Sequence, residues 1–173
     1  QLYIRSTADF VAGDNCPVTP PPTGSGINLG TTSPFILNFD GIESGLPAGV
    51  NVYVADTPIS PNPNLTISLG KVGNYTSTKA LWNATGGGFK NYASATGLTS
   101  ASDQTAQDGS TNRALGVRQV SNTNATNPGT DPGASFVFQL SNTVGKSNMT
   151  LDFLLQSLDP TSGRTTKWTV DYG

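Results

Sequence analysis

The sequence contains no histidine and only one cysteine, Cys16. Histidine is the commonest general base of enzymes and the usual zinc ligand, so its absence argues against hydrolase triads and zinc sites. With one cysteine, no disulfide can form within the chain, and the thiol is free, bonded to another chain, or bonded to sequence outside these 173 residues. We expect the free thiol.

Charged residues are also few. The nine basic and eleven acidic residues leave a net charge of -2. Without a basic surface the chain cannot attract polyanions, so we expect no nucleic-acid partner. No apolar run approaches the roughly 20 residues of a transmembrane helix, so we expect no membrane span. The chain starts at Gln1 with neither a Met nor a secretion signal. From this start we expect a processed or excised fragment.

Glycine, proline and small polar residues are abundant. The 20 glycines, 12 prolines and runs of Ser, Thr and Asn supply turns and β-propensity and few good helix formers. A chain of this length can form one domain with a sizeable core. The composition is typical of an all-β protein that is secreted or displayed on the cell surface.

Short apolar alternations bounded by Gly, Pro or Asn predict strands. The last ones are the most regular: Phe136, Phe138 and Leu140 share one face, and two more amphipathic strands follow. Such strands form antiparallel sheets whose apolar faces must cover each other. We therefore predict an all-β, antiparallel two-sheet sandwich, jelly-roll-like, with an N-terminal extension strand. The predicted strands are 2–4, 8–12, 35–39, 50–54, 65–69, 115–120, 135–140, 149–158 and 165–172, with a surface loop over 70–112.

A proline-rich stretch, PVTPPPTGSG at 17–26, predicts a domain boundary, since proline removes backbone donors and favours extended linkers. We predict an N-terminal strand segment at 1–16, which is either the tail of a preceding domain or a donor strand. A Pro/Gly-rich linker at 17–33 and the sandwich module at 34–173 follow.

Three kinds of site are candidates. Asp40 and Glu43 lie in a glycine-rich turn and could supply hard oxygen ligands to Ca²⁺, or be solvated turn carboxylates. Two carboxyl groups across a cleft could cleave glycosides. The sequence alone cannot show whether any two of the candidate acidic residues form such a pair, and these are Asp40, Glu43, Asp103, Asp108, Asp152 and Asp159. We expect that the chain has no enzymatic activity.

Aromatic residues form the third candidate, because tyrosine and tryptophan rings can stack on sugars. We expect Trp168 to be core, and we nominate Trp82, Tyr75 and Tyr92, from the predicted loop, as ligand contacts. Arg113 and Arg118 are expected to form surface ion pairs. Asn-x-Thr triplets at Asn64, Asn74, Asn83, Asn124 and Asn148 are glycan acceptors or chance matches, and in a bacterial protein we expect most to be bare.

Several stretches resemble known modules. NRALGVRQV (112–120), DPGASFVFQLSNT (131–143), LLQSLD (154–159) and RTTKWTVDYG (164–173) resemble jelly-roll-like modules of large secreted bacterial proteins, often of the type IX secretion route. FDGIESGLPAG (39–49) is similar to cleaved-adhesin and MAM-like sandwiches, although Val50 stands where those families usually have tryptophan. The resemblance spans residues 34–173 and implies adhesion or carbohydrate binding in the bacterial extracellular space. In the adhesin relatives an acidic residue at the place of Asp40 helps to hold calcium.

Modules of this kind continue past the WTVDYG strand, whereas this chain stops at Gly173. We therefore expect an incomplete sandwich, whose exposed sheet edges need a cover. Leu2, Tyr3, Ile4 and Arg5 resemble the missing strand and could complete the sheet in their own chain or in a neighbour.

Two functions follow from these observations. The first is a non-catalytic secreted adhesion or carbohydrate-binding module, whose partner is an extracellular glycan or protein surface. The second is a filament subunit assembled from copies of itself by exchange of the N-terminal donor strand.

Overall fold

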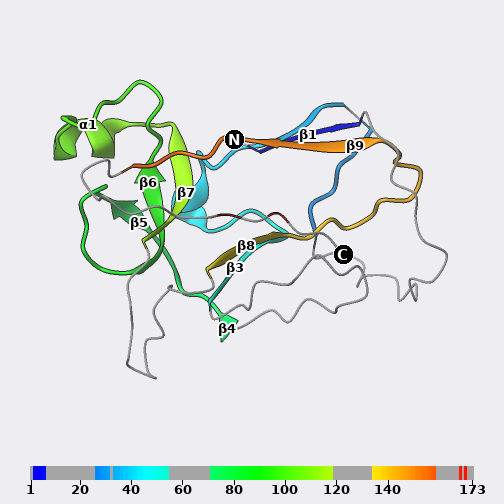
Figure 1. Ribbon diagram of the computed structural model, residues 1–173, viewed down its shortest axis with the longest axis horizontal. Helices are drawn as coiled ribbons and strands as arrows, with labels where there is room; N and C mark the ends of the chain where they lie inside the picture. The colour runs from blue at the N-terminus through cyan, green and yellow to red at the C-terminus, as the bar shows by residue number, and fades with distance from the viewer. Residues whose placement is uncertain are drawn as a thin grey trace.

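The computed structural model describes residues 2–6, 26–31, 33–54, 71–118, 134–158, 168 and 170, with only the backbone given for 2–6 and 71. Strands dominate this part of the chain, together with one short α-helix and one 3-10 turn, which confirms the all-β prediction (Figure 1). The elements are β1 (Leu2–Ser6), β2 (Phe35–Leu37), η1 (Ile42–Ser44), β3 (Val50–Val54), β4 (Lys71–Val72), β5 (Tyr75–Ala80), β6 (Gly88–Ala93), α1 (Gln104–Gly109), β7 (Arg113–Arg118), β8 (Ser135–Phe138) and β9 (Met149–Phe153).

Within the described residues the strands form three sheets of three, with the orders β2-β1-β9, β4-β3-β8 and β5-β6-β7. We call them the first, second and third sheet. Every pairing is antiparallel except that of β5 with β6, which is parallel and irregular between Thr76 and Lys79.

The N-terminal strand is the middle strand of the first sheet. Its residues Leu2, Tyr3 and Ile4 pair with Leu37, Ile36 and Phe35 of β2. On its other side, β1 pairs over its whole length with β9, from Leu2 opposite Phe153 to Ser6 opposite Met149. Figure 1 draws β1 in blue beside β9 in orange. The predicted extension strand therefore completes a sheet of its own chain.

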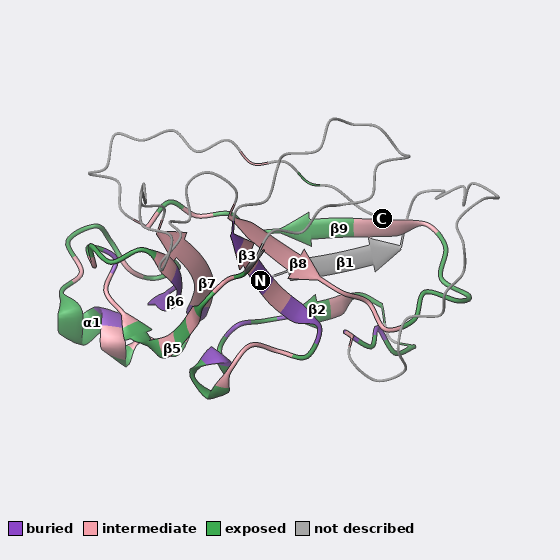
Figure 2. Cartoon of the chain, turned by 90° about the horizontal axis from the view of Figure 1, so that it is seen from below, coloured by how far each residue is buried: buried purple, intermediate pink, exposed green. Residues whose placement is uncertain are grey.

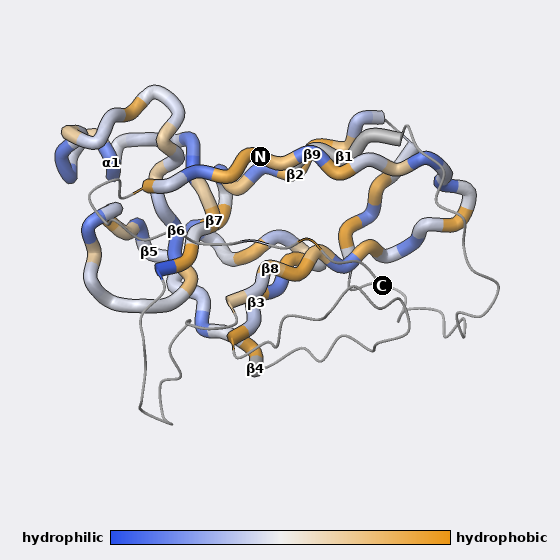
Figure 3. The backbone as a smooth tube through the Cα atoms, viewed as in Figure 1, coloured by the Kyte–Doolittle hydropathy of each residue, from blue (hydrophilic) through white to orange (hydrophobic). Residues whose placement is uncertain are grey.

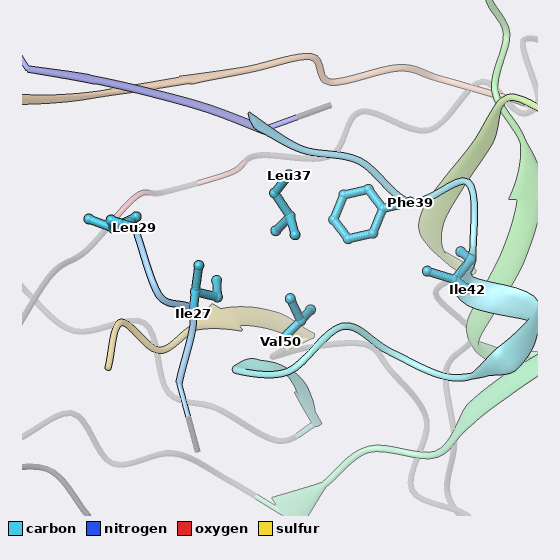
Figure 4. Packing of buried hydrophobic residues seen from close by; sticks show 6 residues of the cluster. All are labelled: Ile27, Leu29, Leu37, Phe39, Ile42 and Val50. Atoms are coloured by element: carbon cyan, nitrogen blue, oxygen red, sulfur yellow. The ribbon is translucent and has the colours of Figure 1, made fainter. Parts of the chain in front are cut away.

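One apolar cluster joins the first and second sheets. It contains Ile27, Leu29, Leu37, Phe39, Ile42 and Val50, with Phe35, Phe138, Leu140 and Met149 packed against it. In Figure 4 the side chains of Leu37 and Phe39 point toward the same space as those of Ile27 and Val50. Figure 3 shows hydrophobic residues along strands of both sheets. The core therefore lies where the alternation of β3 and β8 predicted an apolar face.

The segment before β2 holds this core in place through backbone bonds to the end of β8. Ile27 N–H donates to the Gln139 carbonyl at 2.7 Å, and Ser141 N–H donates to the Ile27 carbonyl at 2.9 Å. Gly49 is required at this junction, because its φ is +78° and a Cβ there would lie 2.5 Å from Ile27 N.

The structure of residues 71–112 corrects one prediction. The surface loop predicted over 70–112 is wrong, because this stretch forms β4, β5, β6 and α1. Its strands carry few apolar residues, so the alternation that predicts strands elsewhere is missing. Asp103 caps α1 by accepting a hydrogen bond from Ala106 N–H at 2.9 Å.

Other predicted strands have mixed outcomes. The strand predicted at 50–54 is confirmed as β3. The strand predicted at 35–39 is shorter and ends at Leu37, and the one predicted at 149–158 ends at Phe153. The strands at 8–12 and 65–69 lie outside the described residues, as does all of 165–172 except Trp168 and Val170. Trp168 is half-buried and stacks on Phe136 of β8 with ring centroids 5.7 Å apart, and Phe136 in turn meets Phe89 of β6 edge to face. These aromatic contacts link the second and third sheets.

Candidate functional site

Arg113, the first residue of β7, is only 5% exposed and anchors a buried polar cluster with Asn91 and Gln107. Its Nε donates to Asn91 Oδ1 at 2.7 Å, and its Nη2 donates to the Asn91 carbonyl at 3.0 Å. Its Nη1 donates to the carbonyls of Gln107 at 2.9 Å and Ser110 at 3.3 Å. The prediction that Arg113 forms a surface ion pair is therefore wrong, because its guanidinium donates to acceptors inside the protein.

The partners of Arg113 are themselves hydrogen-bonded. Asn91 Nδ2 donates to the Ser77 carbonyl at 2.9 Å, which ties β6 to β5. Gln107 accepts from Trp82 N–H at 2.9 Å and donates to the Ser102 carbonyl at 2.9 Å. Buried polar groups that are satisfied in this way stabilise one arrangement of the backbone. We assign the cluster a structural role.

Burial and the nearby carboxylates act on the pKa of the Arg113 guanidinium in opposite directions, and burial has the larger effect. Burial lowers the pKa of the guanidinium, and the charges of Asp108 and Glu43 oppose that shift. Arginine remains protonated in proteins, so a fixed positive charge lies beneath the turn that contains Asp40 and Glu43.

Asp40 and Glu43 are both exposed. Asp40 lies just before η1, and Glu43 lies in it. Asp40 Oδ1 accepts a hydrogen bond from the backbone N–H of Arg113 at 3.0 Å. Over the described ranges, no group of three His, Cys, Asp or Glu side chains that could hold a metal ion occurs. Since Ca²⁺ takes six to eight oxygen ligands, a site here would need mostly backbone carbonyls or water. Calcium binding at Asp40 and Glu43 stays a prediction.

The nominated aromatic residues lie mostly inside the protein. Trp82 and Tyr92 are buried together with Ala93, and the indole of Trp82 donates to the Ala93 carbonyl at 2.8 Å. Tyr92 packs directly over Gly116, where a Cβ would lie 2.6 Å from the ring. The two side chains are only 7% and 4% exposed, and ligand contact by Trp82 and Tyr92 stays a prediction.

Tyr75 is half-buried and links the third sheet to the core. Its hydroxyl donates to the Ile42 carbonyl at 2.7 Å, and its ring packs against the cluster around Ile42. Burial raises the pKa of Tyr75 to about 12, against a smaller opposing effect of Arg113.

Sequence reasoning missed an apolar segment that is exposed. We define it as Leu151–Leu155, in which Leu154 and Leu155 are 60% and 58% exposed and Leu151 and Phe153 are also open. Figure 2 shows the end of β9 coloured as exposed. Alternation in this stretch predicted a buried face, whereas the chain leaves the sheet after Phe153. Contiguous exposed apolar residues mark interaction surfaces in soluble proteins.

The strand-donation candidates Leu2, Tyr3, Ile4 and Arg5 all lie in β1, and the first three are opposite residues of this segment. Tyr3 is opposite Asp152, and Ile4 is opposite Leu151. The first sheet thus brings the nominated donor strand and the apolar segment side by side.

The asparagines of the Asn-x-Thr triplets differ in solvent exposure. Asn74 and Asn83 are exposed, whereas Asn148 is half-buried with φ of 53° and a buried Oδ1 that has no hydrogen-bond partner. Asn64 and Asn124 lie outside the described residues.

Comparison of the chain with family models, curated proteins and solved structures gives no significant match. In the part of the chain that the structure describes, no helix has the length and apolar character needed to cross a membrane.

We predict that Arg113→Met destabilises the protein strongly. The substitution leaves three carbonyl groups and the Asn91 side-chain oxygen without their donor, and an unsatisfied buried polar group costs about 1–3 kcal/mol. Urea denaturation should show a free energy of unfolding lower by at least about 3 kcal/mol. Lys79→Met is the control, because Lys79 is exposed and its ammonium donates to the Asp108 carbonyl at 2.8 Å. Equal, small losses for both variants would contradict the structural role of Arg113.

We predict a loss of stability at alkaline pH that depends on Tyr75. The folded-state pKa of about 12 exceeds the ordinary value of 10.0, so the unfolded state loses this proton first. The contribution is therefore present below pH 10 and is lost as pH rises toward 12. Urea denaturation across this range should show a flatter pH dependence for Tyr75→Phe than for the unaltered chain. The same slope in both proteins would show that Tyr75 is not the group responsible.

Proposed function

We propose that the chain is a non-catalytic adhesion module of a secreted or cell-surface protein and that its partner is a further copy of the same chain. The observation that carries this proposal is the apolar segment Leu151–Leu155, which is exposed at the end of β9 and just after it. A surface of this kind loses water-exposed apolar area when it meets another protein.

The fold that we propose for this module is a two-sheet sandwich of the jelly-roll type. The first and second sheets share the cluster of Ile27, Leu37 and Val50, as the facing sheets of a sandwich share one core. The third sheet extends this core through Tyr75 and Leu115, which pack against the same cluster.

Charge supports association between identical copies. The net charge is only -2 over the whole chain, so two copies repel each other weakly. Within the apolar segment the only charged residue is Asp152. A nearly neutral protein with exposed leucines is suited to homotypic contact, because little charge must be desolvated.

Carbohydrate binding, the other role that the resemblance implies, gains no support from the positions of the nominated rings. Trp82 and Tyr92 are buried, and the hydroxyl of Tyr75 is bonded to the Ile42 carbonyl. We therefore place the contact surface on β9 and the residues after it.

A bead-aggregation assay tests homotypic adhesion. Microspheres coated with the chain should aggregate, and the double substitution Leu154→Ser and Leu155→Ser should reduce aggregation several-fold because it removes exposed apolar area. Val72→Ser is the matched control, since Val72 is 75% exposed but lies on β4 of the second sheet. Thermal unfolding should be the same in all three proteins.

Two results would reject the proposal. One is the absence of aggregation by beads that carry the unaltered chain. The other is equal loss of aggregation in the double variant and in the Val72→Ser control, which would show that the apolar segment has no special part.

A further inference from the structure

In the first sheet, β1 is the middle strand between two strands that lie far from it in the sequence. Residues 2–6 are inserted between β2 and β9, and the described strands β2 and β9 pair with β1 and not with each other. Because β1 is antiparallel to both, β2 and β9 run parallel on its two sides. Removing β1 would leave a gap one strand wide with backbone donors and acceptors on both edges.

The register shows which kind of strand fits the gap. Positions 2 and 4 of β1 are opposite Leu37 and Phe35 on one side and opposite Phe153 and Leu151 on the other. Leu37 is buried in the core, and Phe35 packs against it. The gap therefore accepts an extended segment with apolar residues at alternate positions, which the sequence supplies as Leu2 and Ile4.

The connection between β1 and β2 is long in sequence. Residues 7–25 separate β1 from the segment that Ile27 joins to the end of β8, and they include Pro17, Pro20, Pro21 and Pro22. A long connection lowers the effective concentration of β1 at its own gap, to about a millimolar or less. A second copy at comparable local concentration can then compete for the gap, because it makes the same hydrogen bonds.

We propose that β1 is exchanged between copies, so that β1 of one copy fills the gap between β2 and β9 of another. This inference rests on the proposed homotypic function and names its mechanism. The exchanged strand forms the pairs seen within one chain, in the same register and direction. The apolar segment Leu151–Leu155 adjoins the exchanged strand, so that association through β1 brings a second copy close to it.

Disulfide trapping in the full-length chain tests the exchange. In a Cys16→Ser background, a Tyr3→Cys chain is mixed with an Ile36→Cys chain under mild oxidation, since Tyr3 and Ile36 are register partners. We expect a covalent dimer joined through positions 3 and 36, identified by mass spectrometry, whose yield rises with protein concentration. A Tyr3→Cys chain mixed with an Asp152→Cys chain should give the corresponding link to β9.

Two controls keep this test decisive. A Tyr3→Cys chain mixed with a Val72→Cys chain measures random collision, because Val72 is exposed but belongs to the second sheet. A single chain that carries both Tyr3→Cys and Ile36→Cys should close an internal disulfide at low concentration. The exchange is overturned if the mixed chains give no more dimer than the Val72→Cys control at any concentration.

Light scattering on the same mixtures separates this proposal from the proposed function. Copies that associate without the 3-to-36 link would reject strand exchange and leave homotypic adhesion intact. Copies that remain monomeric at all concentrations would reject both.

Discussion

The backbone pairing of β1 is the interaction on which the first sheet depends. β2 has only three residues, and both β2 and β9 hydrogen-bond to β1 within the described structure. Phe35, Leu37 and Met149 reach the core from these two flanking strands. The burial of the core from this side therefore requires a strand that comes from the far N-terminal end of the chain.

In the third sheet, buried hydrogen bonds add to apolar packing. Its interior contains Asn91 and Arg113 as well as Phe89 and Tyr92, and the hydrogen bonds of the guanidinium connect β6, β7 and α1. Because a buried charge without partners is expensive, these bonds favour one arrangement of the elements. The hydroxyl of Tyr75 then joins this sheet to η1 and thus to the apolar core.

The sequence predicts the strands that alternate and fails where polar residues are buried. Val50, Val52 and Val54 alternate with Asn51 and Tyr53, and they form β3 as predicted. Residues 70–112 are predicted as a loop because few residues there could anchor packing. The Arg113 cluster satisfies the polar groups that are buried there, and its members are distant in sequence, such as Asn91 and Gln107.

The end of β9 also depends on a long-range contact that the local sequence pattern does not predict. The alternation from Met149 to Leu155 predicted a longer strand, but the side chain of Gln156 accepts hydrogen bonds from Ser94 Oγ and Ala95 N–H and holds this segment against the third sheet. That contact is long-range and has no local signature. It leaves Leu154 and Leu155 exposed. The candidate contact surface therefore emerges from tertiary structure, whereas the strand at the start of this sequence is predicted by its own residues and is present as β1.

Amide hydrogen exchange of β1 tests the central point most directly. A strand that is hydrogen-bonded between β2 and β9 should show amides at Tyr3 and Ile4 that exchange far more slowly than those of an unstructured peptide, and as slowly as those of β9. Exchange of Tyr3 and Ile4 at the rate of a free chain, with β9 still protected, would contradict the place of β1 in the sheet and the account built on it.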